Sequence, residues 1–291
     1  MVLTAATFWG LSGTAAQVLF QRDHFSTAWL VALRMLVSGL ALVIWHTFIK
    51  KDSRSRTLIT DPSQWLNLAL FGVVGLYGVQ FSYFQAIARG NAATATLLQY
   101  LGPPMIVAYF SLSYRKAPPK GASFATLLAL AGTLLLVTGA HLDRLEVPSS
   151  AIAWGLLSAL LLAFYTLQPL ALIQRYDAPL VVGWGMLVGA VVSLGVHPIW
   201  EIPAHFYNPI PLFLTLFVVL LGTLAAFSLY LASLHHLHPS EAGLLATAEP
   251  VTAVTASMLF LHVHLDLGQL VGAAFIVLAI VWLSLRRPRW T

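Results

Sequence analysis

Long apolar stretches, separated by short polar ones, follow one another along the whole chain. A membrane-spanning helix needs about 20 predominantly apolar residues, and charge-free runs of this length recur. Barrel strands would alternate apolar and polar residues over about ten positions, and these runs do not alternate. The pattern predicts an all-α integral membrane protein with ten transmembrane helices, over Val2–Phe20, Thr27–Ile49, Pro62–Ala88, Gly90–Tyr114, Gly121–Leu142, Val147–Gln174, Ala178–Trp200, Pro211–His235, Pro239–His262 and Leu267–Leu285.

Composition strengthens this interpretation. Of the 291 residues, 59% are hydrophobic and only 9% are charged, whereas soluble domains carry about 25% charged residues. A soluble protein and a disordered chain are both excluded, because each needs far more polar surface. There is no cysteine, hence no disulfide and no thiolate metal site. The longest polar segment, Lys50–Ser63, is a linker, so residues 1–291 form a single transmembrane domain.

The basic residues indicate the orientation. With both termini on the cytoplasmic side, the loops of the opposite side carry only Arg22, Arg89 and Arg144. The positive-inside rule favours this arrangement in the cell (plasma or inner) membrane, and it leaves no need for a nucleic-acid partner. The basic residues predicted on the cytoplasmic side are Lys50, Lys51, Arg54, Arg56, Arg115, Lys116, Lys120, Arg175, Arg286, Arg287 and Arg289.

The chain also repeats itself. Shifted by 147 residues, 75–140 lies over 222–287 without a gap, and Gly, Tyr and Pro positions coincide in order. The repeats are predicted over 1–145 and 146–291, with five helices each. An odd number of spans inverts the second repeat relative to the first, which is a transporter architecture with the substrate site near the membrane midplane. Matching pairs include Gly75/Gly222, Tyr83/Tyr230, Pro103/Pro250 and Gly121/Gly268.

Several motifs make the chain resemble a known family. They are Phe8–Ser12 (FWGLS), Ala32–Leu36 (ALRML), Leu97–Pro103 (LLQYLGP) and its repeat Leu244–Pro250 (LLATAEP). With these motifs the chain is similar to the drug/metabolite transporter superfamily, in its EamA-like branch. The resemblance implies ten helices around a central cavity and the movement of small metabolites, often amino acids, amines or drugs, frequently outward.

Two full charges lie well inside predicted spans, Arg34 and Glu249. Each costs at least about 2.5–3.5 kcal/mol at a helix centre, and the repeat places Gly185 and Gly102 at the corresponding positions. A structural role would have Arg34 donating to carbonyl groups at a helix break and Glu249 hydrogen-bonded beside Pro250. The functional alternative is that one or both line the cavity, with Glu249 binding a substrate amine or a proton.

Polar and aromatic residues inside the spans supply further cavity candidates. Tyr77, Gln80 and Phe84 have the spacing of one helix face. Gln99 and Tyr100 precede two prolines, whose freed carbonyl groups are tolerated in a membrane only against protein or a wet cavity. Ordinary packing is the alternative for each residue. The predicted substrate-binding candidates are Trp9, Ser12, Arg34, Tyr77, Gln80, Phe84, Gln99, Tyr100, Trp154, Ser158, Tyr165, Tyr230, Thr247 and Glu249.

The sequence therefore predicts a secondary active or facilitative transporter that works by alternating access, as an exporter of a small metabolite. Its expected partners are a small-molecule substrate and the lipid bilayer, with protons as a candidate coupling ion, and it is expected to act as a monomer without cofactor or metal. The alternative functions are a membrane-embedded enzyme and a channel. An enzyme would need a nucleophile–base set or a metal cluster inside the spans, and a channel would need rings of like charge or a carbonyl filter. No GxxxxGK[ST] loop marks an ATP-driven pump.

Overall fold

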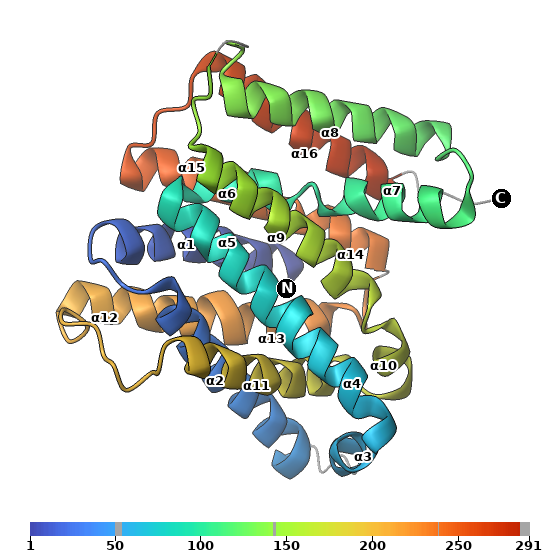
Figure 1. The fold of residues 1–291 in the computed structure, drawn as a ribbon, viewed down its shortest axis with the longest axis vertical. Coiled ribbons are helices and arrows are strands. Elements are labelled where there is room, and N and C mark those ends of the chain that lie inside the picture. Colours follow the sequence, from blue (N-terminus) through green and yellow to red (C-terminus); the bar gives the residue numbers. More distant parts are fainter. Residues whose placement is uncertain (50–53, 142–143, 238, 286–291) are drawn as a thin grey trace.

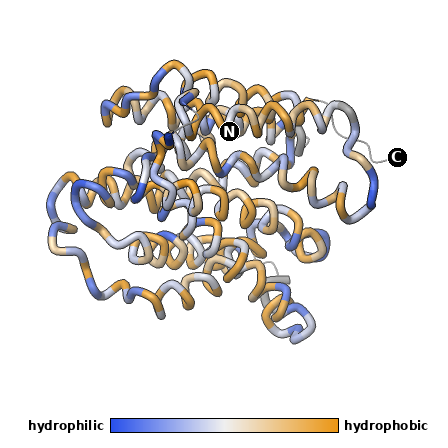
Figure 2. Tube along the Cα trace, turned by 45° about the horizontal axis from the view of Figure 1, so that its top comes forward, coloured by the Kyte–Doolittle hydropathy of each residue, from blue (hydrophilic) through white to orange (hydrophobic). Residues whose placement is uncertain are grey.

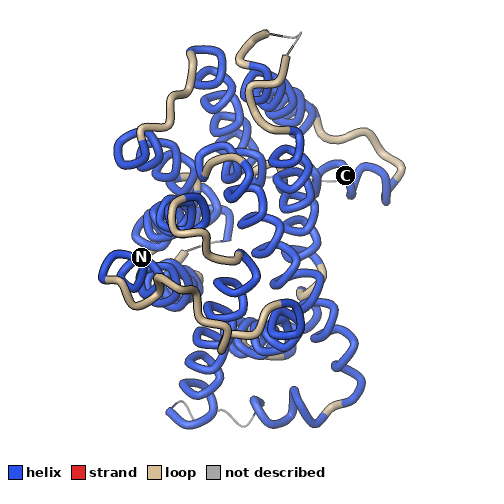
Figure 3. The backbone as a smooth tube through the Cα atoms, turned by 60° about the vertical axis from the view of Figure 1, so that its left-hand side comes forward, coloured by secondary structure: helices blue, strands red, loops and turns tan. Residues whose placement is uncertain are grey.

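The computed structural model describes residues 1–49, 54–141, 144–237 and 239–285, and their regular secondary structure is entirely helical (Figures 1 and 3). The elements in chain order are α1 (Val2–Gln21), α2 (Thr27–Ile44), η1 (Trp45–Ile49), α3 (Arg54–Thr60), α4 (Pro62–Leu70), η2 (Phe71–Tyr77), α5 (Gly78–Arg89), α6 (Ala92–Gln99), α7 (Gly102–Tyr114), α8 (Lys120–Thr138), α9 (Ser149–Leu167), α10 (Leu170–Arg175), α11 (Ala178–Val196), α12 (Pro209–Leu216), η3 (Phe217–Ala225), α13 (Ala226–Ser233), α14 (Pro239–Ala246), α15 (Ala248–Leu261) and α16 (Leu267–Leu285).

Nine helical stretches of the described residues are long and apolar enough to cross a membrane, so the chain is an all-helical membrane protein. The segment predicted over Gly90–Tyr114 is helical as well, but it is broken into α6 and α7 at Tyr100–Leu101. The nine stretches are Val2–Gln21, Thr27–Phe48, Pro62–Arg89, Gly121–Thr138, Ser149–Arg175, Ala178–Val196, Pro209–Ser233, Glu241–Leu261 and Leu267–Leu285.

Two predicted spans end earlier than expected, each for a local reason. Helix α8 ends at Thr138 because Gly139 adopts a left-handed conformation with φ 58°, which terminates a helix. Helix α11 ends at Val196 because His197 precedes Pro198 and is extended, as residues before proline are. Of the basic residues that predicted the orientation, Lys50, Lys51, Arg286, Arg287 and Arg289 lie outside the described residues.

Two of the long helices contain a π-helical segment, in which the turns are wider than in an α-helix. The stretch Pro62–Arg89 runs from α4 through the π-helical η2 into α5, and Pro209–Ser233 runs from α12 through η3 into α13. In η3 the Thr223 hydroxyl donates to the carbonyl oxygen of Val218, five residues earlier, at 2.8 Å. Short π-helical segments inside α-helices occur frequently at functional sites, and both segments contribute residues to the cavity described below.

Helices distant in sequence pack closely because small residues meet at their contacts. Helices α8 and α16 lie side by side, with Gly132 against Gly272, and α2 lies beside α11 (Figure 1). Helix α1 crosses α15 at Gly10, where a Cβ atom would come within 2.8 Å of the Glu249 carbonyl oxygen. This close approach places the first turn of α15 in the middle of the molecule.

The exterior of the helices is apolar. Figure 2 shows hydrophobic residues along the helices and hydrophilic ones mainly in the connections. Leu112, Leu127 and Leu259 are among the exposed side chains, whereas Trp29 and Phe84 are fully buried. An outer surface of exposed leucine, valine and phenylalanine side chains suits contact with lipid. Because lipid tails offer no hydrogen bonds, the backbone polar groups there must bond to one another, as they do within helices.

Candidate functional site

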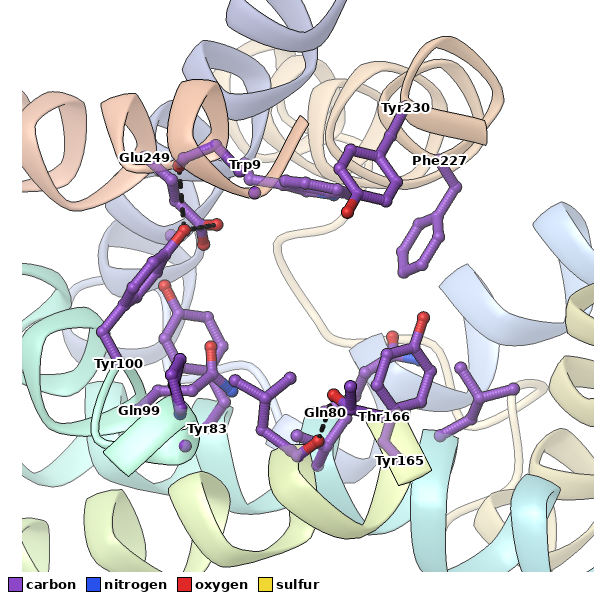
Figure 4. A pocket seen from close by; sticks show the side chains of 18 of the residues that line it. Trp9, Gln80, Tyr83, Gln99, Tyr100, Tyr165, Thr166, Phe227, Tyr230 and Glu249 are labelled. Atoms are coloured by element: carbon purple, nitrogen blue, oxygen red, sulfur yellow. Dashed lines mark hydrogen bonds between the residues drawn. The ribbon is translucent and has the colours of Figure 1, made fainter. Parts of the chain in front are cut away.

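A cavity of about 400 Å³ lies at the centre of the helices (Figure 4). This volume lies within the range of small-molecule sites. Its walls come from both halves of the chain: Trp9, Ser12, Gly13, Arg34, Leu76, Val79, Gln80, Tyr83, Phe84, Gln99, Tyr100, Gly102, Pro103 and Ile106 from the first, and Leu162, Tyr165, Thr166, Gly222, Phe227, Tyr230, Leu231, Gly243, Ala246, Glu249, Ile280 and Ser284 from the second.

Most of the residues selected from the sequence line this cavity. They come from seven different helical segments, so only the folded chain brings them together. The predicted candidates found in its walls are Trp9, Ser12, Arg34, Gln80, Phe84, Gln99, Tyr100, Tyr165, Tyr230 and Glu249.

Four candidates are not in the walls. Tyr77 stacks on Phe81, with their ring centroids 5.4 Å apart. Its neighbour Leu76, which points in another direction from the helix, lines the cavity instead. Trp154 lies edge-on to Phe81 and beneath the guanidinium of Arg89, near the start of α9. Two hydroxyl groups are bonded within their own segments: Ser158 donates to the carbonyl oxygen of Gly155, and Thr247 to that of Leu244.

The breaks of two helices meet at one side of the cavity. Helix α14 ends at Ala246, whose carbonyl oxygen has no partner four residues on, because Pro250 has no N–H group. The Tyr100 hydroxyl, at the end of α6, lies 2.9 Å from this oxygen and 2.9 Å from Oε2 of Glu249. Glu249 stands in the first turn of α15, where the helix dipole favours a negative charge.

Arg34 comes from α2 and reaches the cavity from another direction. Its Nε donates to the hydroxyl oxygen of Thr223 in η3 at 2.9 Å, and its guanidinium lies 4.8 Å above the ring of Phe84. The side chain is 6% exposed. Ion pairs of the described residues lie near helix ends, and none of them includes Arg34.

Aromatic rings form much of the remaining wall. Trp9 contacts Phe227 edge-on and Tyr230 at a tilt, both with ring centroids 5.4 Å apart. Tyr165 stacks on Phe71 of η2 at 5.5 Å. Figure 4 shows the labelled aromatic side chains around the opening, with Trp9 and Tyr230 facing Tyr165 across it. Such rings suit apolar groups and cations placed over their faces.

Among the described residues, the walls of the cavity extend toward one end of the helices. Its walls reach Ser284, near the end of α16, and Thr166, near the end of α9. At the opposite end, the side chain of Gln17 accepts the amide N–H of Ala92, and Gln21 donates to the carbonyl oxygen of Gly90 at 2.7 Å. These bonds hold α1 against the connection between α5 and α6 at that end.

Some wall residues were not among the predicted candidates. Tyr83 belongs to the aromatic cluster of its helix, but its hydroxyl is bonded to that of Thr96 at 2.8 Å. Thr166 and Ser284 stand near predicted span ends, where hydroxyl groups are common. For Tyr83, the matching Tyr83/Tyr230 repeat pair was the available signal.

The described residues offer no obvious metal centre. Among them, no group of three or more His, Asp or Glu side chains is placed to hold an ion. The cavity is instead a mostly apolar chamber with a carboxyl group, a guanidinium and amides in its walls. A helical membrane protein that encloses such a chamber, with access from one end, has the organisation of a membrane transporter.

Comparison with known proteins identifies the family. The EamA-like transporter family matches residues 1–138 and 149–285, and the chain belongs to this family. It is 36% identical over 99% of its length to the uncharacterized inner membrane transporter YicL of Salmonella typhimurium, of which 95% is covered. The protein is therefore a multi-pass membrane transporter and not an enzyme.

More distant relatives agree with this assignment. The uncharacterized transporter YwfM of Bacillus subtilis is 27% identical, over 97% of this chain and 92% of its own. The threonine/homoserine exporter RhtA of Escherichia coli O157:H7 is 28% identical, over 85% of this chain and 78% of its own. A solved structure, titled only as that of a protein, shares the fold with a TM-score of 0.64 at 21% identity, over 98% and 95% of the two chains.

Proposed function

We propose that this transporter moves a small metabolite across the inner membrane by alternating access, as an exporter. The proposed substrates are amino acids, amines or amphipathic drug-like compounds. One observation carries the proposal: a ligand-sized cavity has walls from both halves of the chain, and its walls in the described residues extend toward one end. A transporter at rest in one of two alternating states requires this asymmetry.

In this proposal, the second conformational state of the transporter arises when the two repeats exchange their conformations. Shifted by 147 residues, α8 (120–138) falls on α16 (267–285), and the end of α6 at Gln99 falls on the end of α14 at Ala246. The π-helical η2 falls within η3. Even the left-handed helix ends coincide, at Arg115 and His262, with φ 52° and 51°. These matches, together with the separate family matches to residues 1–138 and 149–285, support two inverted five-helix repeats that exchange conformations.

The contacts of Glu249 support proton coupling. The Tyr100 hydroxyl has one proton but faces two acceptors at 2.9 Å, the Glu249 carboxyl group and the Ala246 carbonyl oxygen. A protonated Glu249 would donate to Tyr100, which could then donate fully to Ala246, so both contacts would be satisfied. An ionised Glu249 would compete with Ala246 for the same proton. The charge of Glu249 therefore changes the hydrogen bonds by which Tyr100 connects the two helix breaks. A residue that couples proton movement to a conformational change must have such an effect.

Direction, orientation and oligomeric state follow from other features. Export of amino-acid-like compounds is favoured by the relative named as a threonine/homoserine exporter. The placement of basic residues favours cytoplasmic termini, so the cavity would open to the cytoplasm, where an exporter loads. Because a single chain encloses the cavity, we propose that a monomer is the functional unit.

Transport into proteoliposomes tests the proposal. Labelled amino acids and amines are offered to the purified protein, with and without a pH gradient. We expect saturable uptake that unlabelled substrate competes away, and a changed response to the gradient in Glu249→Gln. Glu201→Gln, a change of an exposed carboxylate in a connection, serves as the control. Flux that rises linearly with concentration would contradict alternating access, and an unaltered Glu249→Gln variant would remove proton coupling through this residue.

A further inference from the structure

Arg34 is a buried cation that makes no ion pair within contact distance among the described residues, although Glu249 in the same cavity interacts with it electrostatically. Its guanidinium has five N–H groups, and only Nε has an acceptor, the hydroxyl oxygen of Thr223. The four N–H groups of Nη1 and Nη2 find none in the part of the chain that the structure describes. Phe84 interacts with the face of the guanidinium and leaves its in-plane donors unused. Buried charges are normally paired and hydrogen-bonded, so these donors are free to bind an anionic group that enters the cavity.

Gln80 is a second wall residue whose polar side-chain atoms lack hydrogen-bond partners in the described structure. The residue is 6% exposed, and neither its Nε2 nor its Oε1 has a partner in the described structure. Gln80 and Phe84 are four residues apart on α5 and therefore share a face. The Arg34 guanidinium lies over the ring of Phe84, one helical turn along α5 from Gln80. Both residues line the central cavity.

We infer that Arg34 and Gln80 form an anion subsite that takes a carboxylate group of the transported molecule. The two Nη groups would bind the carboxylate as a planar fork, and the Gln80 amide would donate to one of its oxygens. Glu249 lies at another side of the opening from Gln80 (Figure 4), so a second, cationic group of the same molecule can face it. The inference rests on the proposed transport function and defines which part of the cavity reads which substrate group.

Three probes that share one apolar group distinguish recognition of the carboxylate from recognition of the ammonium group. Phenylalanine carries a carboxylate and an ammonium, 3-phenylpropionate only the carboxylate, and phenethylamine only the ammonium. Binding of each to the full-length protein in detergent is measured by calorimetry. We expect Gln80→Leu to weaken phenylalanine and 3-phenylpropionate about tenfold and to leave phenethylamine unchanged. Gln85→Leu, on the same helix but outside the cavity walls, is expected to bind all three as wild type does.

A thermal melt of Gln80→Leu shows whether the variant is folded. Leucine removes an amide that is buried without partners, an arrangement that destabilises a fold, so the variant should melt no lower than wild type. Arg34→Lys keeps the charge but loses the fork and should show the same selective loss for carboxylates. Equal weakening of all three probes, or wild-type protein that binds phenethylamine but neither carboxylate, would overturn the subsite. Saturable amine uptake would still stand in that case, so the two proposals fail separately.

Discussion

The hydroxyl oxygen of Tyr100 lies 2.9 Å from a carboxyl oxygen of Glu249. The two residues belong to different halves of the chain, and each stands where a helix is interrupted, between α6 and α7 and at the start of α15. The same hydroxyl reaches the Ala246 carbonyl oxygen that Pro250 leaves without a helical donor. One side chain therefore joins both interruptions at the wall of the cavity.

Removing this hydroxyl should impair transport. Tyr100→Phe keeps the ring and loses the bridge, and a hydrogen bond to a charged group contributes about 1.5–3 kcal/mol. We expect the initial rate of uptake in proteoliposomes to fall by about tenfold or more. Tyr109→Phe is the matched control, because Tyr109 is exposed on α7. Equal rates for both variants would show that the bridge has no role in transport.

The crossing of α1 and α15 at Gly10 should be intolerant of added volume. A Cβ atom there would come within 2.8 Å of the Glu249 carbonyl oxygen and of the Thr252 side chain. Overpacking of this kind costs about 1–3 kcal/mol, so Gly10→Ala should lower the melting temperature in detergent. A Cβ atom at Gly195 would have no atom within 4 Å. Apart from the higher helix propensity of alanine, Gly195→Ala should therefore melt within about a degree of wild type. If both variants melt alike, the close contact is not present in the protein.

Thr223 should matter because it is the only protein acceptor for Arg34 in the described residues. Thr223→Val keeps the shape and removes the oxygen that accepts from Nε at 2.9 Å. Loss of a bond to a buried charge costs about 1.5–3 kcal/mol, so we expect a lower melting temperature and weaker substrate binding. Thr133→Val removes a hydroxyl that bonds only within its own helix, to Ala129, and should leave binding unchanged. Binding lost equally in both variants would argue against a specific role of Thr223.

Asp61 is a titratable group outside the membrane-spanning segments. Its pKa is held below the usual value, chiefly by the Ser63 hydroxyl, then by the Ser63 N–H and the nearby Arg175 at 3.3 Å. A carboxyl group with a depressed folded-state pKa stabilises the protein above its unfolded pKa of about 3.9 and ceases to do so as the pH falls through the folded-state value. The melting-temperature difference between wild type and Asp61→Asn should therefore stay constant from about pH 5 to 8 and shrink below about pH 4. A difference that changes between pH 5 and 8 would contradict this.

Much of the fold was predictable because the membrane demands long apolar helices. The predicted span Leu267–Leu285 coincides with α16, and the charge at Arg89 ended the third span correctly to within a residue. The span predicted as one helix over Gly90–Tyr114 is interrupted between α6 and α7, directly before the prolines that were expected to free backbone carbonyl groups. The wide turns η2 and η3 were not predictable, because their local sequences are ordinary apolar runs and the widening depends on neighbouring helices.

The cavity was harder to predict than the spans. Residue spacing shows which side chains share a face but not the direction of that face, and the face containing Tyr77 is turned toward Phe81. Nor does a sequence give the shape of the space between helices, so Trp154 was selected although it lies beside Arg89, away from the walls. Charge was the more reliable guide. Arg34 and Glu249 are costly in a bilayer, and both line the cavity.

Alternating access around this cavity is the central claim, and the absence of cysteine from the chain makes it directly testable. A single cysteine is introduced at Gln99, a half-buried wall residue at the break of the helix. Its rate of modification by a membrane-impermeant thiol reagent is measured separately from each side of the membrane. The account predicts modification from both sides, with any condition that slows one rate raising the other. Modification from the side of the termini alone, under every condition, would contradict it.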